Sequence, residues 1–312
     1  MLAVEIFQFQ YTHNEIYRRF VDIRNINPAD IQKAEQIPFL PITFFKTHRV
    51  QTTEFEPRAI FESSGTTQSV NSKHYIKDTG LYTENFIKGF ELFYGNTRDW
   101  CILGLLPSYL ERSNSSLIVM VDELIRRSGH EKSGFYINQY DELAECLNRL
   151  ERQRQKTLLI GVTFALLDFA EAYPAELKFT TVMETGGMKG RRAEIIRAEV
   201  HDRLKAAFKV SKIHSEYGMT ELLSQAYSGG DGIFYTTDRM KVLLRSEDDP
   251  YRILTPGDKE TQGIINVIDL ANLYSCSFIA TDDAGRLYPN GSFEVLGRVD
   301  NSDIRGCSLM AL

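Results

Sequence analysis

The chain has 312 residues, of which 43% are hydrophobic and 25% charged, a composition that allows a large core and argues against disorder. The formal net charge of -6, without a long run of Lys or Arg, excludes the basic footprint of a nucleic-acid-binding protein. No apolar run reaches the roughly 20 residues of a membrane span, and MLAVEIFQFQ lacks the basic region and the cleavage site of a secretory signal.

The first hundred residues predict helices around one extended segment. Residues 11–35 predict helix, with a stop near Asn27 and Pro28. Residues 37–50, IPFLPITFFKTHRV, contain two prolines and predict an extended segment. Asp78 and Thr79 form a cap-like pair before aromatic residues at helical spacing, which predict a further helix.

Strands and helices alternate from residue 100 to about 217. The apolar runs WCILGLL, KTLLIG and KFTTVME predict buried strands, and KVSKIHSEY predicts another short one. Helices follow them, among them a long one with Ile196, Val200, Leu204 and Ala207 on one apolar face. This alternation predicts an α/β fold with a mainly parallel sheet covered by helices. From about residue 230, short runs such as RMKVLLRS and GIINVIDL predict an antiparallel, β-rich part.

Three loops carry chemistry suited to a nucleotide. They are Ser63-Ser64-Gly65-Thr66-Thr67, Glu184-Thr185-Gly186-Gly187 and Ser215-Glu216-Tyr217-Gly218-Met219-Thr220-Glu221. Glycine lets backbone N–H groups approach phosphate oxygens, hydroxyls add donors, a Tyr ring offers a flat face, and a carboxylate can bind Mg²⁺. Each loop alone is more often an ordinary turn or helix cap. The GxxxxGK[ST] phosphate loop is absent, which excludes that class of NTPase.

Taken together, the loops resemble those of the adenylate-forming superfamily, the acyl- and aryl-CoA ligases and their relatives. SSGTT is similar to the phosphate loop of that superfamily and YGMTE to its adenine- and magnesium-contacting motif. Thr281-Asp282-Asp283 resembles its ribose-binding segment, and GRVDNSDIRG (297–306) resembles its hinge. All four occur in family order over residues 61–306. The resemblance implies the large domain of such an enzyme, with ATP and Mg²⁺ as cofactors.

The usual adenylating enzyme continues past the hinge into a small mobile domain that carries a lysine. This sequence stops at Leu312, so we expect that domain to be absent, by truncation or because this branch works differently. We expect an adenylate-forming core over residues 1–296 and a hinge-like tail over 297–312. In place of the missing lysine, Lys46, Lys73 or Lys189 is available, and the family-like FFK segment favours Lys46.

Within the superfamily, the chain looks like the LuxE-type acyl-protein synthetases. The segments that carry this resemblance are LPITFFK, SSGTT, LPSYLERSNSSL, ETGGMKG and RGCSLM. The resemblance implies activation of a long-chain fatty acid to acyl-AMP and transfer to a cysteine near the C-terminus. In that family the acyl group then passes to a partner reductase, so an acyl-accepting partner protein is expected.

Cys307 matches the acylated position, and the neighbouring Arg305 would favour its thiolate. The other cysteines (Cys101, Cys146, Cys276) show no metal-binding spacing and are expected to pack as small hydrophobic residues. Their scatter, without paired spacing, predicts a reduced, cytoplasmic protein.

The resemblance assigns the remaining roles by motif position. Ser63, Ser64, Gly65, Thr66 and Thr67 would hold the phosphates, and Gly186, Gly187, Tyr217 and Gly218 would border the adenine. Thr220 would contact the α-phosphate and Glu221 would bind Mg²⁺. Asp283 would hold the ribose, with Asp282 as a near alternative, and Arg298 would add a contact to ribose or phosphate.

Two rival functions remain open from the sequence. The chain could be the large domain of an acyl- or aryl-CoA ligase, in which case Cys307 would be dispensable. It could also be a non-catalytic homologue that binds a nucleotide or an acyl ligand, which would bind ATP without exchanging pyrophosphate.

Overall fold

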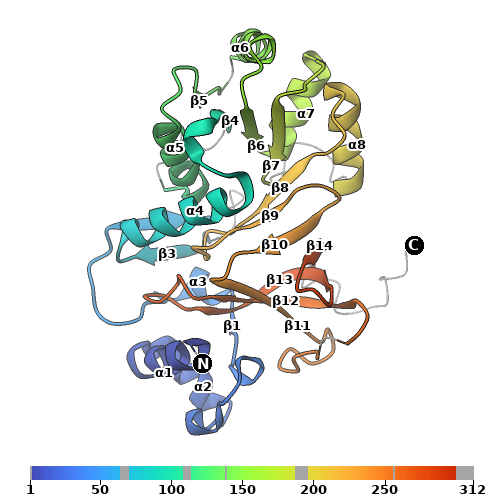
Figure 1. Ribbon diagram of the computed structural model, residues 1–312. Coiled ribbons are helices and arrows are strands. Elements are labelled where there is room, and N and C mark those ends of the chain that lie inside the picture. Colours follow the sequence, from blue (N-terminus) through green and yellow to red (C-terminus); the bar gives the residue numbers. More distant parts are fainter. Residues whose placement is uncertain are drawn as a thin grey trace. The chain divides into compact units, whose positions relative to one another are not determined.

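The computed structural model describes residues 2–63, 70–107, 114–137, 139–186, 196–255 and 257–299. The chain forms two compact units (Figure 1). One, which we call the helix-covered unit, spans Phe55–Thr237, and the other, the β-rich unit, combines Met1–Glu54 with Asp238–Leu312. In the described part of the chain, none of the helices has both the length and the apolarity to cross a membrane.

The sheet of the helix-covered unit is parallel at its centre and antiparallel at one edge. Its strand order is β10-β9-β8-β7-β6-β4-β5. The parallel strands are β4 (Cys101–Leu105), β5 (Gly134–Phe135), β6 (Thr157–Gly161), β7 (Thr180–Glu184) and β8 (His214–Tyr217). The antiparallel strands are β9 (Ala226–Ser228) and β10 (Ile233–Thr236). All residues of β4 and β6 are buried, as expected of parallel strands covered on both faces.

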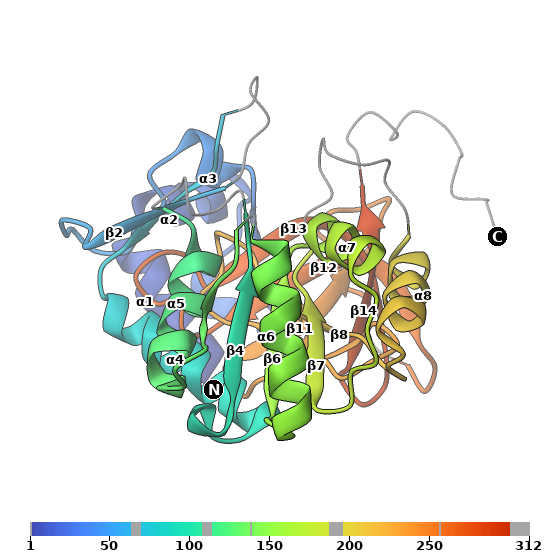
Figure 2. The same ribbon diagram turned by 90° about the horizontal axis from the view of Figure 1, so that it is seen from above.

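Helices cover both faces of this sheet (Figure 2). They are α4 (Thr79–Tyr94), α5 (Ser116–Ser128), α6 (Tyr140–Gln153), α7 (Thr163–Ala172) and α8 (Arg197–Phe208), with the short η3 (Thr97–Asp99) before β4. Because residues alternate along β8, neighbouring side chains point to opposite faces. His214 contacts Tyr94 of α4, whereas Ser215 contacts His201 of α8, so α4 and α8 lie on opposite faces. A hairpin of β2 (Ala59–Glu62) and β3 (Lys73–Ile76) completes the unit.

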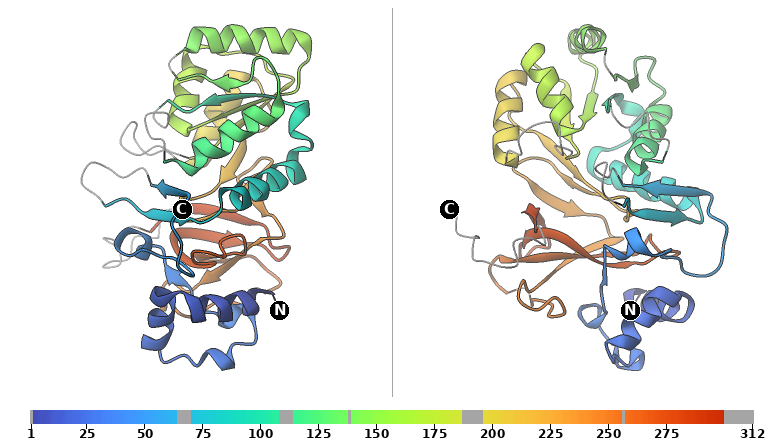
Figure 3. Two further views of the ribbon diagram at one scale, coloured as in Figure 1. Left: turned by 90° about the vertical axis from the view of Figure 1, so that its left-hand side faces the viewer. Right: turned by 180° about the vertical axis from the view of Figure 1, so that it is seen from behind.

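The β-rich unit is an antiparallel sheet with the N-terminal helices packed on it (Figure 3). Its strands are β11 (Met240–Arg245), β12 (Thr261–Asp269), β13 (Phe278–Leu287) and β14 (Phe293–Arg298), and β1 (Leu40–Pro41) pairs in parallel with β13. The N-terminal elements are α1 (Leu2–His13), α2 (Glu15–Ile23), η1 (Pro28–Asp30), η2 (Ala34–Gln36) and α3 (Phe44–Thr47). Gln10 of α1 donates to the carbonyls of Asn272 and Leu273 and accepts from the Ser277 N–H, which ties α1 to the connection between β12 and β13.

Most of the expected elements are confirmed, and three expectations are wrong in detail. Residues 11–35 contain the end of α1, the whole of α2, η1 and the start of η2 rather than one helix, because the Asn14 side chain accepts the Tyr17 N–H and starts a new helix. Residues 37–50 are not wholly extended, since they contain the short helix α3. Ile196 is the N-cap of α8 and 73% exposed, whereas Val200 and Leu204 are buried as expected.

Candidate functional site

The carboxyl ends of β6, β7 and β8 lie side by side at one edge of the sheet. In the strand register Gly161 is opposite Glu184, and Glu184 is opposite Ser215. The turns that leave these strands therefore start next to one another. We call this edge the rim; the carboxyl ends of parallel strands are where α/β sheets bind ligands. Two of the three predicted loops, those at Glu184 and Tyr217, meet there.

The hairpin that carries the third loop contacts the same edge. His74 of β3 is buried, and its Nδ1 lies 2.8 Å from the Thr220 carbonyl oxygen, so the tautomer protonated at Nδ1 donates to it. Ser63 closes the base of the hairpin loop: its N–H donates to the Ser72 carbonyl and its hydroxyl accepts the Ser72 N–H at 2.9 Å. The residues that follow, Ser64, Gly65, Thr66 and Thr67, lie outside the described residues, as does Gly187.

The turn after β7 is held by a buried carboxylate. Oε2 of Glu184 accepts the Gly186 N–H at 2.7 Å and the Thr163 hydroxyl at 3.2 Å. The Gly186 carbonyl in turn accepts the Thr163 N–H at 2.9 Å. Gly186 has a φ of 73°, which suits glycine. The N–H and the carbonyl of Gly186 therefore both form hydrogen bonds within the protein. What Gly186 contributes to the rim is the conformation of the backbone turn.

Glu184 is ionised across the working pH range although it is only 3% exposed. Burial pushes its pKa up, but the neighbouring His201 side chain, the charge of Arg197, the Ser215 side chain and the Gly186 N–H outweigh burial and lower the pKa to about 2. Arg197 Nε lies 3.4 Å and His201 Nε2 3.6 Å from Oε1 of Glu184. The end of β7 thus carries a fixed negative charge that α8 compensates.

Tyr217 and Gly218 sit where β8 enters its loop. Tyr217 is 8% exposed, and its ring centroid lies 5.9 Å from that of Phe234. Gly218 is exposed, and a Glu216 carboxyl oxygen lies closer than van der Waals contact to the position that a Cβ at residue 218 would take. A larger residue at 218 would require this carboxyl to shift.

Glu216 is a second buried carboxyl at the rim, and it is neutral at pH 7. Burial, together with the charge of Glu184, raises its pKa from 4.5 to about 8. Between these pH values the folded protein holds a proton that the unfolded chain has lost. Stability therefore falls as pH rises, by about 1.4 kcal/mol per pH unit, and levels off above pH 8.

The substitution Glu216→Gln tests this pH dependence. The amide is neutral at every pH, so we expect the variant to gain stability over the wild type as pH rises from 5 to 8. Urea unfolding of both proteins at pH 5, 7 and 9 measures the difference. If the free energies of unfolding of the two proteins changed with pH in the same way, Glu216 would ionise in the folded state like an exposed glutamate.

Thr220 and Glu221 follow in the same loop. The carbonyl of Thr220 is fixed by His74, and Asn85 of α4 donates to the Leu223 carbonyl and the Ser224 hydroxyl just beyond Glu221. Glu221 is 6% exposed. Among the described residues, no three His, Cys, Asp or Glu side chains gather to hold a metal by themselves. A single carboxylate is compatible with Mg²⁺, because protein sites commonly supply this ion with one or two carboxylates beside substrate phosphates. The role of Glu221 as a Mg²⁺ ligand stays a prediction.

The remaining predicted residues belong to the β-rich unit. Asp283 of β13 is opposite Arg298 of β14, whose Nε lies 3.5 Å from the carboxylate. The Asp283 N–H donates to the Thr281 hydroxyl at 3.2 Å, so the T-x-D segment is locally braced. Asp282 lies beside them, and its carbonyl accepts the Val299 N–H. Lys46 is an exposed residue of α3.

Two of the three described cysteines are buried thiols with a raised pKa. Cys101 and Cys276 are buried, and burial raises the pKa of each thiol to about 12. The expectation that they pack as small hydrophobic residues is confirmed. Cys146 is partly exposed on α6. Cys307 lies outside the described residues.

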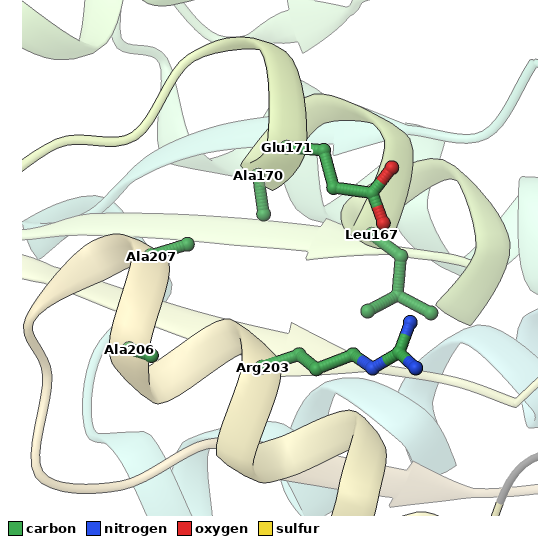
Figure 4. Close-up of a pocket in the computed structure, with 6 residues that line it drawn as sticks. All are labelled: Leu167, Ala170, Glu171, Arg203, Ala206 and Ala207. Atoms are coloured by element: carbon green, nitrogen blue, oxygen red, sulfur yellow. The ribbon is translucent and has the colours of Figure 1, made fainter.

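One cavity, of about 370 Å³, lies between α7 and α8 in the helix-covered unit (Figure 4). Leu167, Ala170 and Ala207 form its apolar wall, and Glu171 and Arg203 stand at its border. These residues occupy the middle and C-terminal parts of the two helices, whereas the rim lies at their N-terminal ends. The cavity contains none of the predicted site residues.

Sequence reasoning missed the roles of four residues at the rim. Glu184 and Glu216 lie in predicted loops but were given no role of their own, and Arg197 and His74 were not assigned to the site. A carboxylate that ends an apolar strand directly before a glycine turn, as in TTVMETGG, is a signal for a buried anchor that could have identified Glu184. His74 gives no such local signal, because its partner Thr220 lies 146 positions further along the chain. Arg197 gives none either, because its partner Glu184 belongs to a different element.

The fold is that of the large domain of adenylate-forming enzymes. ATP-bound MatB from Rhodopseudomonas palustris matches with a TM-score of 0.56 at 17% identity, over 77% of this chain and 48% of MatB. O-succinylbenzoate coenzyme A synthetase (MenE) from Bacillus subtilis, with ATP and magnesium ion, matches with a TM-score of 0.52 at 17% identity, over 77% of this chain and 49% of MenE. The chain thus spans about half the length of either enzyme.

The model of the acyl-protein synthetase family, LuxE, matches residues 2–311. The chain therefore belongs to the LuxE acyl-protein synthetase family, which confirms the resemblance found in the sequence. No curated protein sequence gives a significant match.

Proposed function

We propose that the protein uses ATP to activate a carboxylic acid as an acyl-adenylate and passes the acyl group to Cys307 and then to a partner protein. The observation that carries this proposal is the family match over residues 2–311, because the family is described as an acyl-protein synthetase. The fold supports it, since MatB and MenE with this fold were solved with ATP, MenE together with a magnesium ion. A long-chain fatty acid is the acid that we expect from the resemblance.

The helix-covered unit would supply the contacts to the phosphates and the adenine. The hydroxyls and N–H groups of residues 63–67 would hold the β- and γ-phosphates, and Thr220 would donate to the α-phosphate. Gly186, Gly187, Gly218 and the Tyr217 ring would border the adenine. Glu221 would hold Mg²⁺, which supplies positive charge to the phosphate oxygens.

The β-rich unit would supply contacts to the ribose and a cation for the α-phosphate. The Asp283 carboxylate would accept hydrogen bonds from the ribose hydroxyls, and Arg298 would remain paired with it or contact a phosphate. Lys46 would supply the cation that offsets charge on the α-phosphate during acid activation.

The proposed reaction has two steps. A carboxylate oxygen of the acid attacks the α-phosphorus, a new P–O bond forms, and the bond to pyrophosphate breaks. The Cys307 thiolate then attacks the acyl carbonyl, so that a thioester forms and AMP leaves; the thiol proton passes to water. The protein mainly aligns the reactants and offsets charge, which are the terms that accelerate such transfers.

The proposal is tested by identifying the products with and without coenzyme A. The protein is incubated with ATP, Mg²⁺ and saturated fatty acids of several chain lengths, and acyl-AMP, acyl-CoA and acylated protein are measured by mass spectrometry. We expect acyl-AMP and acylated protein, with no dependence on coenzyme A. Acyl-CoA as the sole acyl product would instead assign the chain to the coenzyme A ligases. The absence of every acyl product would leave a non-catalytic binding protein.

A further inference from the structure

Glu184 connects the turn after β7 to the ring of Tyr217. One oxygen, Oε2, accepts the Gly186 N–H at 2.7 Å and the Thr163 hydroxyl at 3.2 Å, which fastens the turn to the start of α7. This oxygen therefore fixes a backbone conformation, at a φ of 73°, that the turn adopts at the rim.

The other carboxylate oxygen of Glu184 lies close to a cation of α8. Oε1 lies 3.4 Å from Arg197 Nε, and the Arg197 guanidinium carbon lies 5.1 Å from the centroid of the Phe234 ring. The Phe234 ring lies 5.9 Å from that of Tyr217. A cation over an aromatic face is held by the ring quadrupole, and its position here is set by the carboxylate. The contacts thus run from Glu184 through Arg197 and Phe234 to Tyr217.

We propose that Glu184 is a positioning residue for nucleotide binding, which fixes the Thr185-Gly186 turn and, through the contacts of Arg197 with Phe234 and of Phe234 with Tyr217, orients the Tyr217 ring beside the base. This inference rests on the proposed ATP-dependent function. Because Glu184 is 3% exposed, it acts through these neighbours and not by touching the nucleotide. Its loss is therefore expected to weaken binding of the base and to leave contacts with the triphosphate intact.

The opposite end of β7 provides a matched control. Glu151 of α6 accepts the N–H groups of Lys178 and Phe179 at 2.8 and 3.1 Å and the Thr180 hydroxyl at 2.6 Å. Like Glu184, it is a carboxylate that ties down backbone N–H groups and a threonine hydroxyl beside the same strand. It lies at the amino end of β7, away from the rim. Glu151→Gln thus weakens similar hydrogen bonds but leaves the contacts from Glu184 through Arg197 and Phe234 to Tyr217 unchanged.

The test compares wild type, Glu184→Gln, Glu151→Gln and Arg197→Lys by calorimetric titration with ATP and, separately, with inorganic triphosphate in the presence of Mg²⁺. Glutamine keeps an oxygen for the Gly186 N–H but removes the charge that holds Arg197. Lysine keeps the charge but loses the planar group over Phe234. We expect Kd for ATP to rise about tenfold in both rim variants, with Kd for triphosphate unchanged. Glu151→Gln should bind ATP as the wild type does.

The outcomes distinguish a failure of the positioning role from a failure of the proposed function. An unchanged Kd for ATP in both Glu184→Gln and Arg197→Lys, with a wild type that binds ATP, would overturn the positioning role and leave the proposed function standing. Equal losses in Glu184→Gln and Glu151→Gln would also overturn it, since they would reveal general destabilisation. A wild type that binds no ATP would overturn the proposed function itself. Thermal unfolding of each variant shows that it is folded, and Arg197→Lys keeps the test decisive if Glu184→Gln does not fold.

Discussion

Replacing Cys307 with serine is expected to abolish acylation of the protein while leaving acid activation intact. A hydroxyl with its ordinary high pKa is a much weaker nucleophile than a thiolate at pH 7, so the acyl-adenylate would form without being transferred. Labelled fatty acid with ATP and Mg²⁺ would give a hydroxylamine-sensitive label on the wild type and none on Cys307→Ser. Exchange of pyrophosphate with ATP would be equal in both.

Cys146→Ser is the matched control for this experiment. Cys146 is the partly exposed one of the described cysteines, and the thiols of Cys101 and Cys276 stay protonated because burial raises their pKa to about 12. The control should therefore be labelled like the wild type. Label that persists in Cys307→Ser and disappears in Cys146→Ser would contradict the assignment of the acyl acceptor.

Replacing Glu221 with glutamine is expected to reduce acid-dependent ATP–pyrophosphate exchange by about 100-fold or more, because Mg²⁺ loses its protein carboxylate where negative charge develops. The exchange rate measured over a range of Mg²⁺ concentrations would also show a higher requirement for the ion. This second effect separates a role in metal binding from a simple loss of folded protein.

Glu62→Gln is the control for Glu221→Gln. Glu62 lies on the hairpin, and its carboxylate pairs with the half-exposed Lys73 at 3.6 Å. Such exposed pairs contribute little, about 1 kcal/mol or less, so this variant should keep its exchange rate. Wild-type exchange and an unchanged Mg²⁺ requirement in Glu221→Gln would show that another group binds the ion.

The parallel part of the fold was predictable from the sequence, because local patterns specify it. Apolar runs such as TLLIG mark strands buried on both faces, and the cap at Asp78 and the glycine at Gly129 mark the ends of helices. The positions of two candidate loops at the rim followed from the strands that precede them. The position of a strand in a parallel sheet determines where the loop after its carboxyl end begins.

The long-range contacts were not predictable from these patterns. The pairing of Leu40 with Ile279 joins segments from opposite ends of the chain, and a two-residue strand containing a proline gives no recognisable signal. Ser63 illustrates the limit for the site: its sequence context suggests a phosphate donor, whereas the structure also uses its hydroxyl to accept the Ser72 N–H. Which partners a side chain finds depends on tertiary structure.

Acid-dependent exchange of labelled pyrophosphate into ATP tests the central claim, activation of a carboxylic acid, most directly. The full chain is assayed with Mg²⁺ and fatty acids of increasing chain length, beside a reaction without acid. We predict exchange that requires both Mg²⁺ and the acid and that is strongest with long-chain acids. Exchange that is absent with every acid, from a folded protein that binds ATP, would contradict the proposed function.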